Sequence, residues 1–376
     1  MGILGGGQLG RMMVLAAAPL GIETHIFSDA GGNCPAAQVT PHLTVAAFDD
    51  VAALAKFAAS VDVITYEFEN IPLEAVQYLA TLKPVYPSPA TLAMTQHRIL
   101  EKKFINAGGI ATALWQGVDH FAELLAIRAA WPGHDVILKT TQMGYDGKGQ
   151  VKIPANATSE MAEKLWRDLH PFADTHITNA KNLPRFIAEQ AVDFIAEGSV
   201  IIVRNKMGEK TAYPLVENCH RNHILSESIL PMDRQLLAEN LPSDAQKIAE
   251  NLAERFDLIG ILAVEMFVTS DRKILVNELA PRPHNSGHWS IDGCVTSQFE
   301  QAVRAVCGLS LGAIDLVYPV GFDASNSKII MQNLLGDEVS NWPQILSEPY
   351  SKLHLYGKTD KLRGRKMGHV TRFVKI

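Results

Sequence analysis

A glycine-rich turn near the start of the chain constrains the fold more than any other stretch. An apolar helical pattern over 11–19 and a predicted strand over 23–27 follow it. The glycines that fit the pattern G-x-G-x-x-G are Gly5, Gly7 and Gly10. A strand, a glycine turn, a helix and a second strand are typical of a Rossmann-like α/β domain. Because Asp29 stands near the usual acidic position, an NAD(P)-dependent oxidoreductase is one interpretation, and a Rossmann-like domain that binds no dinucleotide is the other.

The next segments continue the alternation of strands and helices. We expect a strand over 44–46, a helix over 51–59 and a strand over 61–65 that runs into Glu67 and Glu69. Ligands of open parallel sheets bind at the carboxyl ends of the strands, so these carboxylates are candidates for a binding site. The alternative is a solvated loop.

A second glycine-rich stretch lies over 142–150, before a predicted strand at 151–153. Three glycines within six residues leave backbone N–H groups uncovered, so the stretch can close on phosphate oxygens while Lys139 and Lys148 add positive charge. It lacks the ending of a Walker loop, so it would hold ATP as a mobile loop between strands. An exposed glycine-rich hairpin is the alternative.

The chain divides into three predicted domains. Prolines cluster over 84–89, and an amphipathic helix is predicted over 91–106. The predicted domains are a Rossmann-like domain over 1–98, a central domain over 99–300 with a small subdomain over about 112–190, and a small β-rich domain over 301–376.

Two glutamates are predicted to face each other across a β-hairpin. Apolar strands over 261–268 and 274–279 flank a turn, and a turn at Asp271 and Arg272 places Glu265 opposite Glu278. Facing carboxylates among apolar residues repel each other unless a proton or a cation lies between them. Oxygen ligands without His or Cys favour Mg²⁺. The alternative is that both glutamates point into water.

Two further stretches are suited to anions. The loop over 281–289 carries Arg282 among prolines, histidines and an asparagine, a set of donors that would stabilise a transferring phosphoryl group. Five basic residues lie between Lys358 and Lys366. Such a run is alternatively a solvated surface.

The composition excludes some classes of function. With 47% hydrophobic residues and a formal charge of -6, the chain predicts a globular protein that binds neither nucleic acid nor an anionic membrane. No apolar run approaches the length of a membrane span. The cysteines are far apart and form no C-x-x-C pair, which favours a reducing cytoplasm; they are Cys34, Cys219, Cys294 and Cys307.

The motifs in this order resemble the ATP-grasp superfamily, and within it the N5-carboxyaminoimidazole ribonucleotide synthetase family. The resemblance spans essentially the whole chain. The stretches that carry it are the turn at 5–10, Lys139 with 144–149, Glu265 with 277–278, and the motifs at 66–70, 278–288 and 364–369. Only four residues precede the glycines, fewer than the family's first strand usually has, so an internal start at Met1 is an open alternative.

The resemblance implies an α/β (α+β) fold with a Rossmann-like N-terminal domain, central ATP-grasp domains and a small β-rich C-terminal domain. It implies a ligase that uses ATP and Mg²⁺ to carboxylate 5-aminoimidazole ribonucleotide with bicarbonate, through carboxyphosphate, in purine biosynthesis. The expected partners are these small molecules and a second copy of the chain in a homodimer. Another ATP-grasp carboxylate-amine ligase is the alternative within the superfamily.

The resemblance also assigns roles to individual residues. Those expected at ATP are Arg98, Lys139, Gly144, Tyr145, Asp146, Gly147, Lys148, Gly149, Gln150, Glu189, Gln190, Ala191, Val192, Glu197, His220, Asn277 and Glu278. Those expected at Mg²⁺ are Glu265 and Glu278. Those expected at the ribonucleotide are Gln8, Glu69, Asp146, Lys358 and Arg365. Those expected to act in catalysis are Arg282, which would stabilise bicarbonate and carboxyphosphate, Asp146, which would steer the amine, and Lys139.

Overall fold

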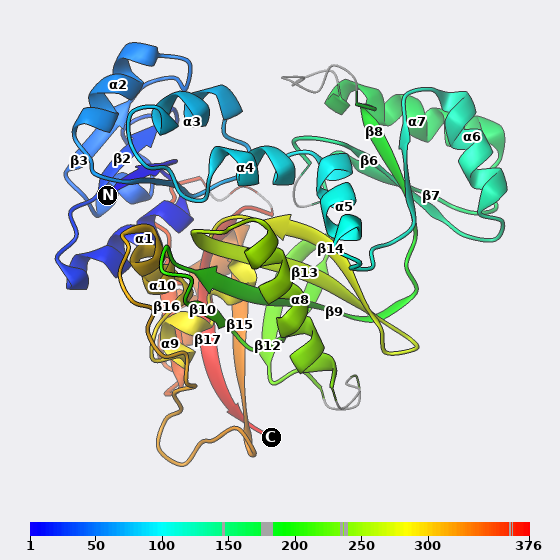
Figure 1. Ribbon diagram of the computed structural model, residues 1–376. Helices are drawn as coiled ribbons and strands as arrows, with labels where there is room; N and C mark the ends of the chain where they lie inside the picture. The colour runs from blue at the N-terminus through cyan, green and yellow to red at the C-terminus, as the bar shows by residue number, and fades with distance from the viewer. Residues whose placement is uncertain (145–146, 174–182, 234–235, 237–239, 361, 363) are drawn as a thin grey trace.

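The computed structural model of the 376-residue chain describes every residue except 145–146, 174–182, 234–235, 237–239, 361 and 363. Its strands form three sheets. In Figure 1 the N-terminal part lies at the upper left, a small sheet with two helices lies at the upper right, and a large sheet lies below and between them.

The N-terminal sheet is parallel, as the glycine turn predicts. Its strand order is β3-β2-β1-β4. The strands are β1 (Gly2–Leu4), β2 (His25–Ser28), β3 (His42–Val45) and β4 (Ile64–Tyr66). The helices around it are α1 (Gln8–Ala17), η1 (Ala18–Leu20), η2 (Ala36–Gln38), α2 (Val51–Ala59), α3 (Leu73–Ala80) and α4 (Pro89–Thr95). Glu67 and Glu69 follow the carboxyl end of β4, and both line the cavity described below.

The single helix predicted over 91–106 is wrong, because two helices form there. Helix α4 ends at Thr95, and α5 (Arg98–Ala107) begins three residues later. The Gln96 amide donates to the carbonyls of Glu69 and Ile71, and His97 is extended with φ -123° and ψ 108°. This break sets Arg98 at the first turn of α5, where its N–H donates to the carbonyl of Thr141 over 2.9 Å.

The small sheet is antiparallel, in the order β5-β8-β6-β7. Its strands are β5 (Trp115–Val118), β6 (Val136–Thr140), β7 (Gln150–Ile153) and β8 (Phe186–Gln190). One core joins it to α6 (Phe121–Ala130) and α7 (Ser159–Ala173), and Trp166 and Phe186 lie in this core. The predicted glycine stretch therefore connects β6 to β7.

The large sheet has nine strands, in the order β14-β13-β9-β11-β12-β15-β17-β16, with β10 beside β9. The strands are β9 (Phe194–Arg204), β10 (Lys210–Ala212), β11 (Val216–Arg221), β12 (Ile224–Leu230), β13 (Gly260–Thr269), β14 (Ile274–Ala280), β15 (Ser327–Leu335), β16 (Ser351–Leu355) and β17 (Lys366–Lys375). Because β15 pairs with β12, the C-terminal strands extend the same sheet as the glutamate hairpin.

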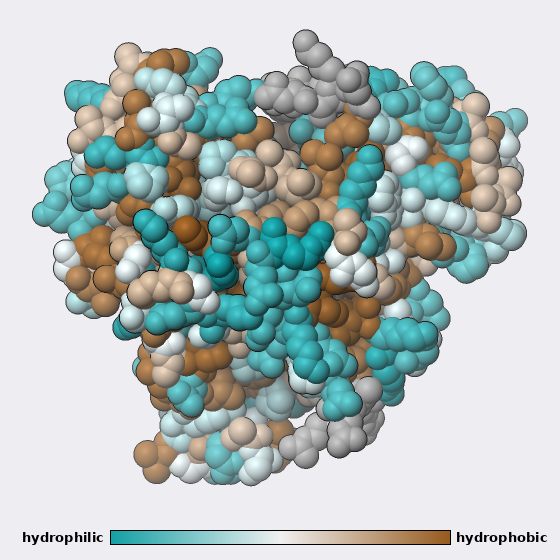
Figure 2. Space-filling model, in the orientation of Figure 1, coloured by the Kyte–Doolittle hydropathy of each residue, from teal (hydrophilic) through white to brown (hydrophobic). Residues whose placement is uncertain are grey.

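Helices cover this sheet and join it to the N-terminal part. They are α8 (Leu241–Arg255), η4 (Asn285–Gly287), α9 (Ser290–Gly293), α10 (Gln298–Val306), η5 (Gly336–Asn341) and α11 (Trp342–Leu346). Hydrophilic side chains gather over α8 in Figure 2, while its apolar side packs on the sheet through Ala249 and Leu252. Helix α10 shares a core with α1 through Phe299 and Met13. None of the described helices is both long and apolar enough to cross a membrane.

Candidate active site

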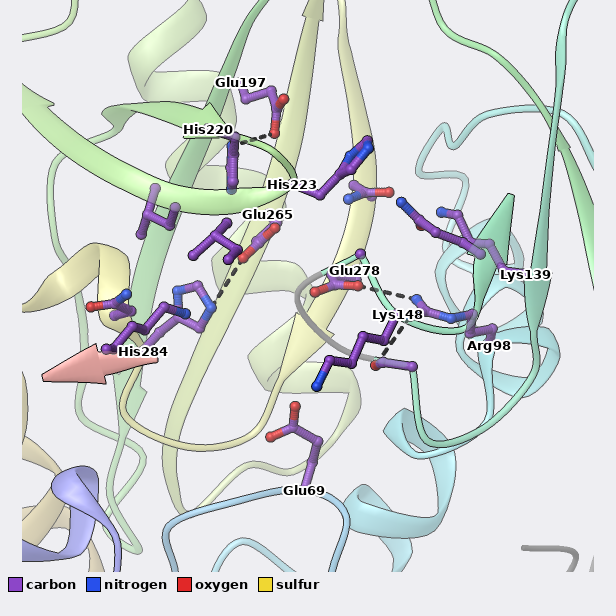
Figure 3. Close-up of a pocket in the computed structure, with 18 of the residues that line it drawn as sticks. Glu69, Arg98, Lys139, Lys148, Glu197, His220, His223, Glu265, Glu278 and His284 are labelled. Atoms are coloured by element: carbon purple, nitrogen blue, oxygen red, sulfur yellow. Dashed lines mark hydrogen bonds and ion pairs between the residues drawn. The ribbon is translucent and has the colours of Figure 1, made fainter. Parts of the chain in front are cut away.

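Nearly all of the predicted site residues line one cavity of about 910 Å³ between the three parts of the molecule. Figure 3 shows the acidic and basic side chains that point into it. The predicted residues in its lining are Gln8, Glu69, Arg98, Lys139, Gly144, Gly147, Lys148, Gln150, Glu189, Gln190, Ala191, Val192, Glu197, His220, Glu265, Asn277, Glu278, Arg282, Lys358 and Arg365. Gly149 lies in the same loop but not in the lining, and Tyr145 and Asp146 lie outside the described residues.

The glycine stretch between β6 and β7 is folded against its neighbours. Thr140 donates its N–H to the carbonyl of Gly149 over 2.8 Å, and Gly149 has φ +72°. Gly147 has φ +77°, and a Cβ there would lie 2.5 Å from the Cβ of His223, in the turn between β11 and β12. Both positions therefore require glycine, and Gly147 lies against the turn between β11 and β12 of the large sheet.

Lys139, one of the residues predicted to bind phosphate, belongs to a buried cluster of charged side chains with Lys102 and Glu189. The Lys139 ammonium is 3.0 Å from Glu189 Oε2, and the Lys102 ammonium is 3.7 Å from the same oxygen. Burial alone would raise the pKa of Glu189, but the positive charges of Lys102 and Lys139 outweigh it and lower the pKa to about 2. The Glu189 carboxylate is thus ion-paired with the two lysines, and the residues that follow it, 190–192, line the cavity.

Replacing Glu189 by glutamine should destabilise the protein strongly at neutral pH. The change leaves two buried ammonium groups without their carboxylate, which costs roughly 3–5 kcal/mol. Because the folded pKa of Glu189 is depressed to about 2, its contribution is present above its ordinary pKa of 4.5 and is lost as the pH falls toward 2. Thermal melting of both proteins from pH 7 to pH 3 should therefore show a large gap that narrows in acid.

Glu163→Gln provides the matched control for this prediction. Glu163 pairs with Arg167 in α7 with both side chains exposed, so its loss should change stability by no more than about 0.5 kcal/mol. A melting gap for Glu189→Gln that is equally small, or that stays constant with pH, contradicts the role of the buried cluster.

The predicted facing of Glu265 and Glu278 is confirmed, although the predicted turn is wrong. The hairpin turn has three residues, 270–272, with Arg272 at φ +62°, and not two. This shifts the pairing next to the turn by one residue, so that Met266 pairs with Val276. A β-bulge with Asn277 as the extra residue shifts it back and sets Glu265 opposite Glu278.

Each of these glutamates has a basic partner. Glu265 Oε1 is 3.0 Å from His284 Nε2, and Glu278 Oε2 is 3.1 Å from Arg98 Nη1 (Figure 3). Burial would raise the pKa of Glu265, but the hydrogen bond and charge of His284 outweigh it and lower the pKa to about 2. The Glu265 carboxylate is therefore held as an anion beside the cavity, and Glu278 is ion-paired with Arg98.

The hairpin residues fit Mg²⁺. Two carboxylates face each other, and Asn277 Oδ1 between the strands is buried without a hydrogen-bond partner among the described residues. Hard cations such as Mg²⁺ take oxygen ligands of this kind. The part of the chain that the structure describes contains no cluster of three or more His, Cys, Asp or Glu suited to a metal. Substrate phosphates would therefore have to complete the coordination.

A polar pair and an apolar pair lie on the wall formed by β9, β11 and β13. Glu197 Oε2 is 2.9 Å from His220 Nδ1, and burial, which lowers the pKa of His220, is outweighed by this carboxylate, so that the pKa is raised. Phe194 and Phe267 stack with their centroids 4.7 Å apart, and both line the cavity. An apolar surface beside a carboxylate suits a base with a ribose.

Glu69 and Arg282 were given separate roles by the resemblance, and the structure shows that they are partners. The Arg282 guanidinium donates to both Glu69 oxygens, through Nε and, over 2.8 Å, through Nη2. Burial would raise the pKa of Glu69, but the charge and hydrogen bonds of Arg282 lower it to about 2. This bidentate pair connects the end of β4 to the loop after β14, and it lies beside His284.

The basic C-terminal stretch faces the same cavity from the opposite side. Lys358 donates to the carbonyl of Lys366 over 2.8 Å, and Arg365 donates to the carbonyl of Asp360 over 3.2 Å. Lys358, Arg365 and Lys366 line the cavity together with Gln8 at the start of α1. The three basic residues of this run that the structure describes therefore lie together at one end of the site, and not on the solvated surface that was the alternative.

The first glycine turn holds a carboxylate of the protein itself, and this argues against a dinucleotide site. Glu67 Oε2 accepts the N–H of Gly10 over 2.6 Å, and Oε1 accepts the N–H of Gly7. A Cβ on Gly5 would lie 2.5 Å from Glu67 Cγ. The N-terminus of α1, where a pyrophosphate would bind, is thus occupied by Glu67. This arrangement contradicts the NAD(P) interpretation, while Glu67, which binds the glycine turn, also lines the cavity.

Sequence reasoning missed several residues of the site. Lys102 was only one of the basic residues of a helix, and nothing in its local pattern distinguishes it from Lys103. His284 stood in the donor-rich loop, but its pairing with Glu265 required the fold. Neither His223, in the turn between β11 and β12, nor Phe267, in β13, carried a signal of its own in the sequence.

Comparison with known families agrees with this geometry. The model described as ATP-grasp domain matches residues 103–299. The model described as ribonucleotide synthetase preATP-grasp domain matches residues 1–96, and that described as phosphoribosylaminoimidazole carboxylase C-terminal domain matches residues 330–375.

Individual relatives are similar over nearly the whole chain. The bifunctional purine synthesis protein purC/E of Dictyostelium discoideum is 45% identical over 386 residues, which cover 99% of this chain and 36% of that protein. The N5-carboxyaminoimidazole ribonucleotide synthase of Brucella melitensis biotype 1 is 44% identical over 372 residues, which cover 99% of this chain and 95% of that protein.

Solved structures match at the level of the fold. A crystal structure of the ADP complex of an N5-carboxyaminoimidazole ribonucleotide synthetase has a TM-score of 0.87 and 39% identity, over 99% of this chain and 91% of that chain. The Aspergillus clavatus N5-carboxyaminoimidazole synthase, in complex with ADP and 5-aminoimidazole ribonucleotide, has a TM-score of 0.85 and 28% identity, over 100% of this chain and 93% of that chain.

Proposed function

Because the chain belongs to the N5-carboxyaminoimidazole ribonucleotide synthase family of ATP-grasp enzymes, we infer that it carboxylates 5-aminoimidazole ribonucleotide at the expense of ATP in purine biosynthesis. The observation that carries this function is the single cavity in which the glutamate hairpin, the phosphate-binding candidates and the basic C-terminal stretch meet. The substrate carbon comes from bicarbonate, and the products are the N5-carboxyamino ribonucleotide, ADP and phosphate.

The chemistry explains why these groups must share one enclosed space. Bicarbonate is a poor electrophile, and its phosphorylation gives carboxyphosphate, in which phosphate is a leaving group. The amine of the ribonucleotide then attacks either carboxyphosphate or the CO₂ that it releases. In both routes the C–O bond to phosphate breaks, an N–C bond forms and the amine loses a proton. Water would destroy carboxyphosphate, so the second substrate has to be bound before it forms.

The ATP side of the cavity is formed by the small sheet, α5 and the wall of the large sheet. Arg98, Lys139 and Lys148 supply positive charge for the phosphates, and Gly144 and Gly147 let the backbone approach them. The backbone over 189–192 receives adenine next to Phe194 and Phe267, and Glu197, oriented by His220, accepts the ribose hydroxyls.

Mg²⁺ is the proposed cation, and Glu265, Glu278 and Asn277 are the residues that would hold it. When bound, it would neutralise charge on the phosphates as the γ-phosphoryl group is transferred. Arg98 keeps Glu278 in place from one side, and His284 keeps Glu265 in place from the other.

The ribonucleotide side is formed by the basic stretch and the end of β4. Lys358 and Arg365 are proposed to bind the phosphate of the ribonucleotide, and Gln8 and Glu69 its ribose or aminoimidazole. Arg282, oriented by Glu69, is proposed to stabilise bicarbonate and carboxyphosphate. The roles given to Tyr145 and Asp146 concern residues outside those described.

The decisive experiment measures phosphate release from ATP with Mg²⁺ and bicarbonate, with and without 5-aminoimidazole ribonucleotide. We expect release to depend strongly on the ribonucleotide and to match the formation of the carboxyamino product. Release that is indifferent to the ribonucleotide, or that responds instead to formate or to an amino acid, would identify another ATP-grasp ligase. The three domains predicted from the sequence, a homodimer and a cytoplasmic location remain proposals, which limited proteolysis, sedimentation and cell fractionation would test.

A further inference from the structure

Helix α5 contacts the edge of the glutamate hairpin through residues that share one helix face. Arg98, Glu101 and Lys102 are spaced i, i+3 and i+4, so their side chains point the same way. Strand β14 is the first strand in the order of the large sheet, and beyond an isolated bridge between Val276 and Thr112 its outer edge pairs with no further strand among the described residues. The face of α5 therefore stands where another strand would otherwise pair.

The side chains on this face of α5 contact three consecutive residues of β14. Lys102 Nζ donates to the carbonyl of Asn277 over 2.8 Å, and the N–H of Leu279 donates to Glu101 Oε1 over 2.7 Å. Between them, Arg98 binds the carboxylate of Glu278. Side chains of the helix thus supply the hydrogen bonds that a neighbouring strand would have made.

The contact of Lys102 falls on the extra residue of the β-bulge. The bulge is what places Glu278 opposite Glu265 after the three-residue turn, and its extra peptide does not fit the regular ladder. A buried carbonyl without a partner would cost free energy, and an ammonium donor gives a charge-assisted bond in its place. Lys102 is 1% exposed, so this bond is shielded from water.

The same ammonium also belongs to the charge cluster of the small sheet. It lies 3.7 Å from the Glu189 carboxylate, which Lys139 binds more closely. One buried group on α5 therefore touches both the strand that leads to the proposed adenine contacts and the strand that carries the proposed Mg²⁺ ligands. Exposed Lys103, the next residue, touches neither.

We propose that Lys102 is a positioning residue: by binding the Asn277 carbonyl it fixes the β-bulge, and thereby the Asn277 and Glu278 side chains toward the metal and the nucleotide phosphates. This inference rests on the proposed function, which identifies the ligands of the site. The role proposed for Lys102 concerns only the part of the site that would bind ATP and Mg²⁺.

The test compares Lys102→Met with the control Lys103→Met in the full chain. Calorimetry measures ADP affinity with and without Mg²⁺, and thermal melting without ligands measures stability. Loss of groups that orient metal ligands weakens metal affinity or activity by about 10–100-fold. We therefore expect the gain in ADP affinity that Mg²⁺ provides to fall by about that factor in Lys102→Met and to be unchanged in Lys103→Met.

A Lys102→Met protein that melts at a lower temperature but keeps the full Mg²⁺ gain would overturn the proposal, because Lys102 would then only attach the helix to the sheet. If the methionine variant does not fold, Lys102→Gln decides. Its amide can donate to a carbonyl but is one bond shorter, so a gain reduced by about threefold or more is expected, and a gain equal to that of the unaltered protein refutes the proposal.

The binding measurement needs no ribonucleotide. Failure of the unaltered protein to carboxylate 5-aminoimidazole ribonucleotide would therefore reject the proposed function while the effect of Lys102 on Mg²⁺-dependent nucleotide binding is still measured.

Discussion

Replacing Glu278 by glutamine should lower the carboxylation rate by about 10³-fold or more while the protein remains folded. The loss of a carboxylate at the proposed metal site removes several kcal/mol of charge stabilisation from phosphoryl transfer, and each 1.4 kcal/mol corresponds to about tenfold in rate. Glutamine keeps the shape of the side chain and an oxygen that can accept from Arg98. Steady-state turnover and thermal melting, measured on the same preparations, check both parts of the prediction.

The stability half of this prediction follows from exposure. The Glu278 side chain is 39% exposed, so the loss of its ion pair with Arg98 should change stability by no more than about 1 kcal/mol. Glu227→Gln is the control, because Glu227 lies on β12 of the same sheet and pairs with Arg221 at 3.9 Å, outside the cavity lining. An inactive Glu278→Gln protein that has also unfolded would mean that Glu278 is structural. A folded variant with full activity would mean that Glu278 has no role in the reaction.

Arg282→Lys should have the second largest effect, a loss of about 10²–10³-fold in turnover. Lysine keeps the positive charge, but a single ammonium cannot donate to both Glu69 oxygens and hold the orientation of the guanidinium. Because a charge remains beside the buried Glu69, we expect the fold to survive. The measurements are turnover and the KM values for bicarbonate and for the ribonucleotide.

Arg304→Lys is the matched control for this change. Arg304 donates to Glu300 within α10, and both side chains are 28% exposed, so activity should not change. Glu69→Gln, and the double variant that combines it with Arg282→Lys, complete a double-mutant cycle. If Glu69 acts through Arg282, the two losses should be far from additive. Fully additive losses would mean that the pair does not act as a unit.

The sequence alone determined the fold class, because the signals for it are local. The turn with Gly5, Gly7 and Gly10 joins a strand to a helix within a few residues, and the structure has the expected parallel sheet there. The motifs that carry the family resemblance are also local, so most of the residues that they indicated line the cavity.

Where the sequence misled, a distant partner changed the result. The predicted helix over 91–106 is divided at His97, where Gln96 binds the carbonyls of Glu69 and Ile71. The same glycine turn that predicted a fold correctly also suggested a dinucleotide, and only the arrival of Glu67 from β4 shows that its anion site is filled.

Tertiary structure decided which charges meet. Glu69 and Arg282 are 213 positions apart, and no periodicity relates them. The opposition of Glu265 and Glu278 was predicted from a two-residue turn, yet it results from a three-residue turn corrected by a bulge at Asn277. Helix propensity and strand alternation act over neighbouring residues, whereas ion pairs and bulges depend on what the rest of the chain brings to the same place. The sequence therefore determined the elements and the kind of site. The geometry of the site was decided by the packing of α5 against β14 and of the end of β4 against the loop after β14.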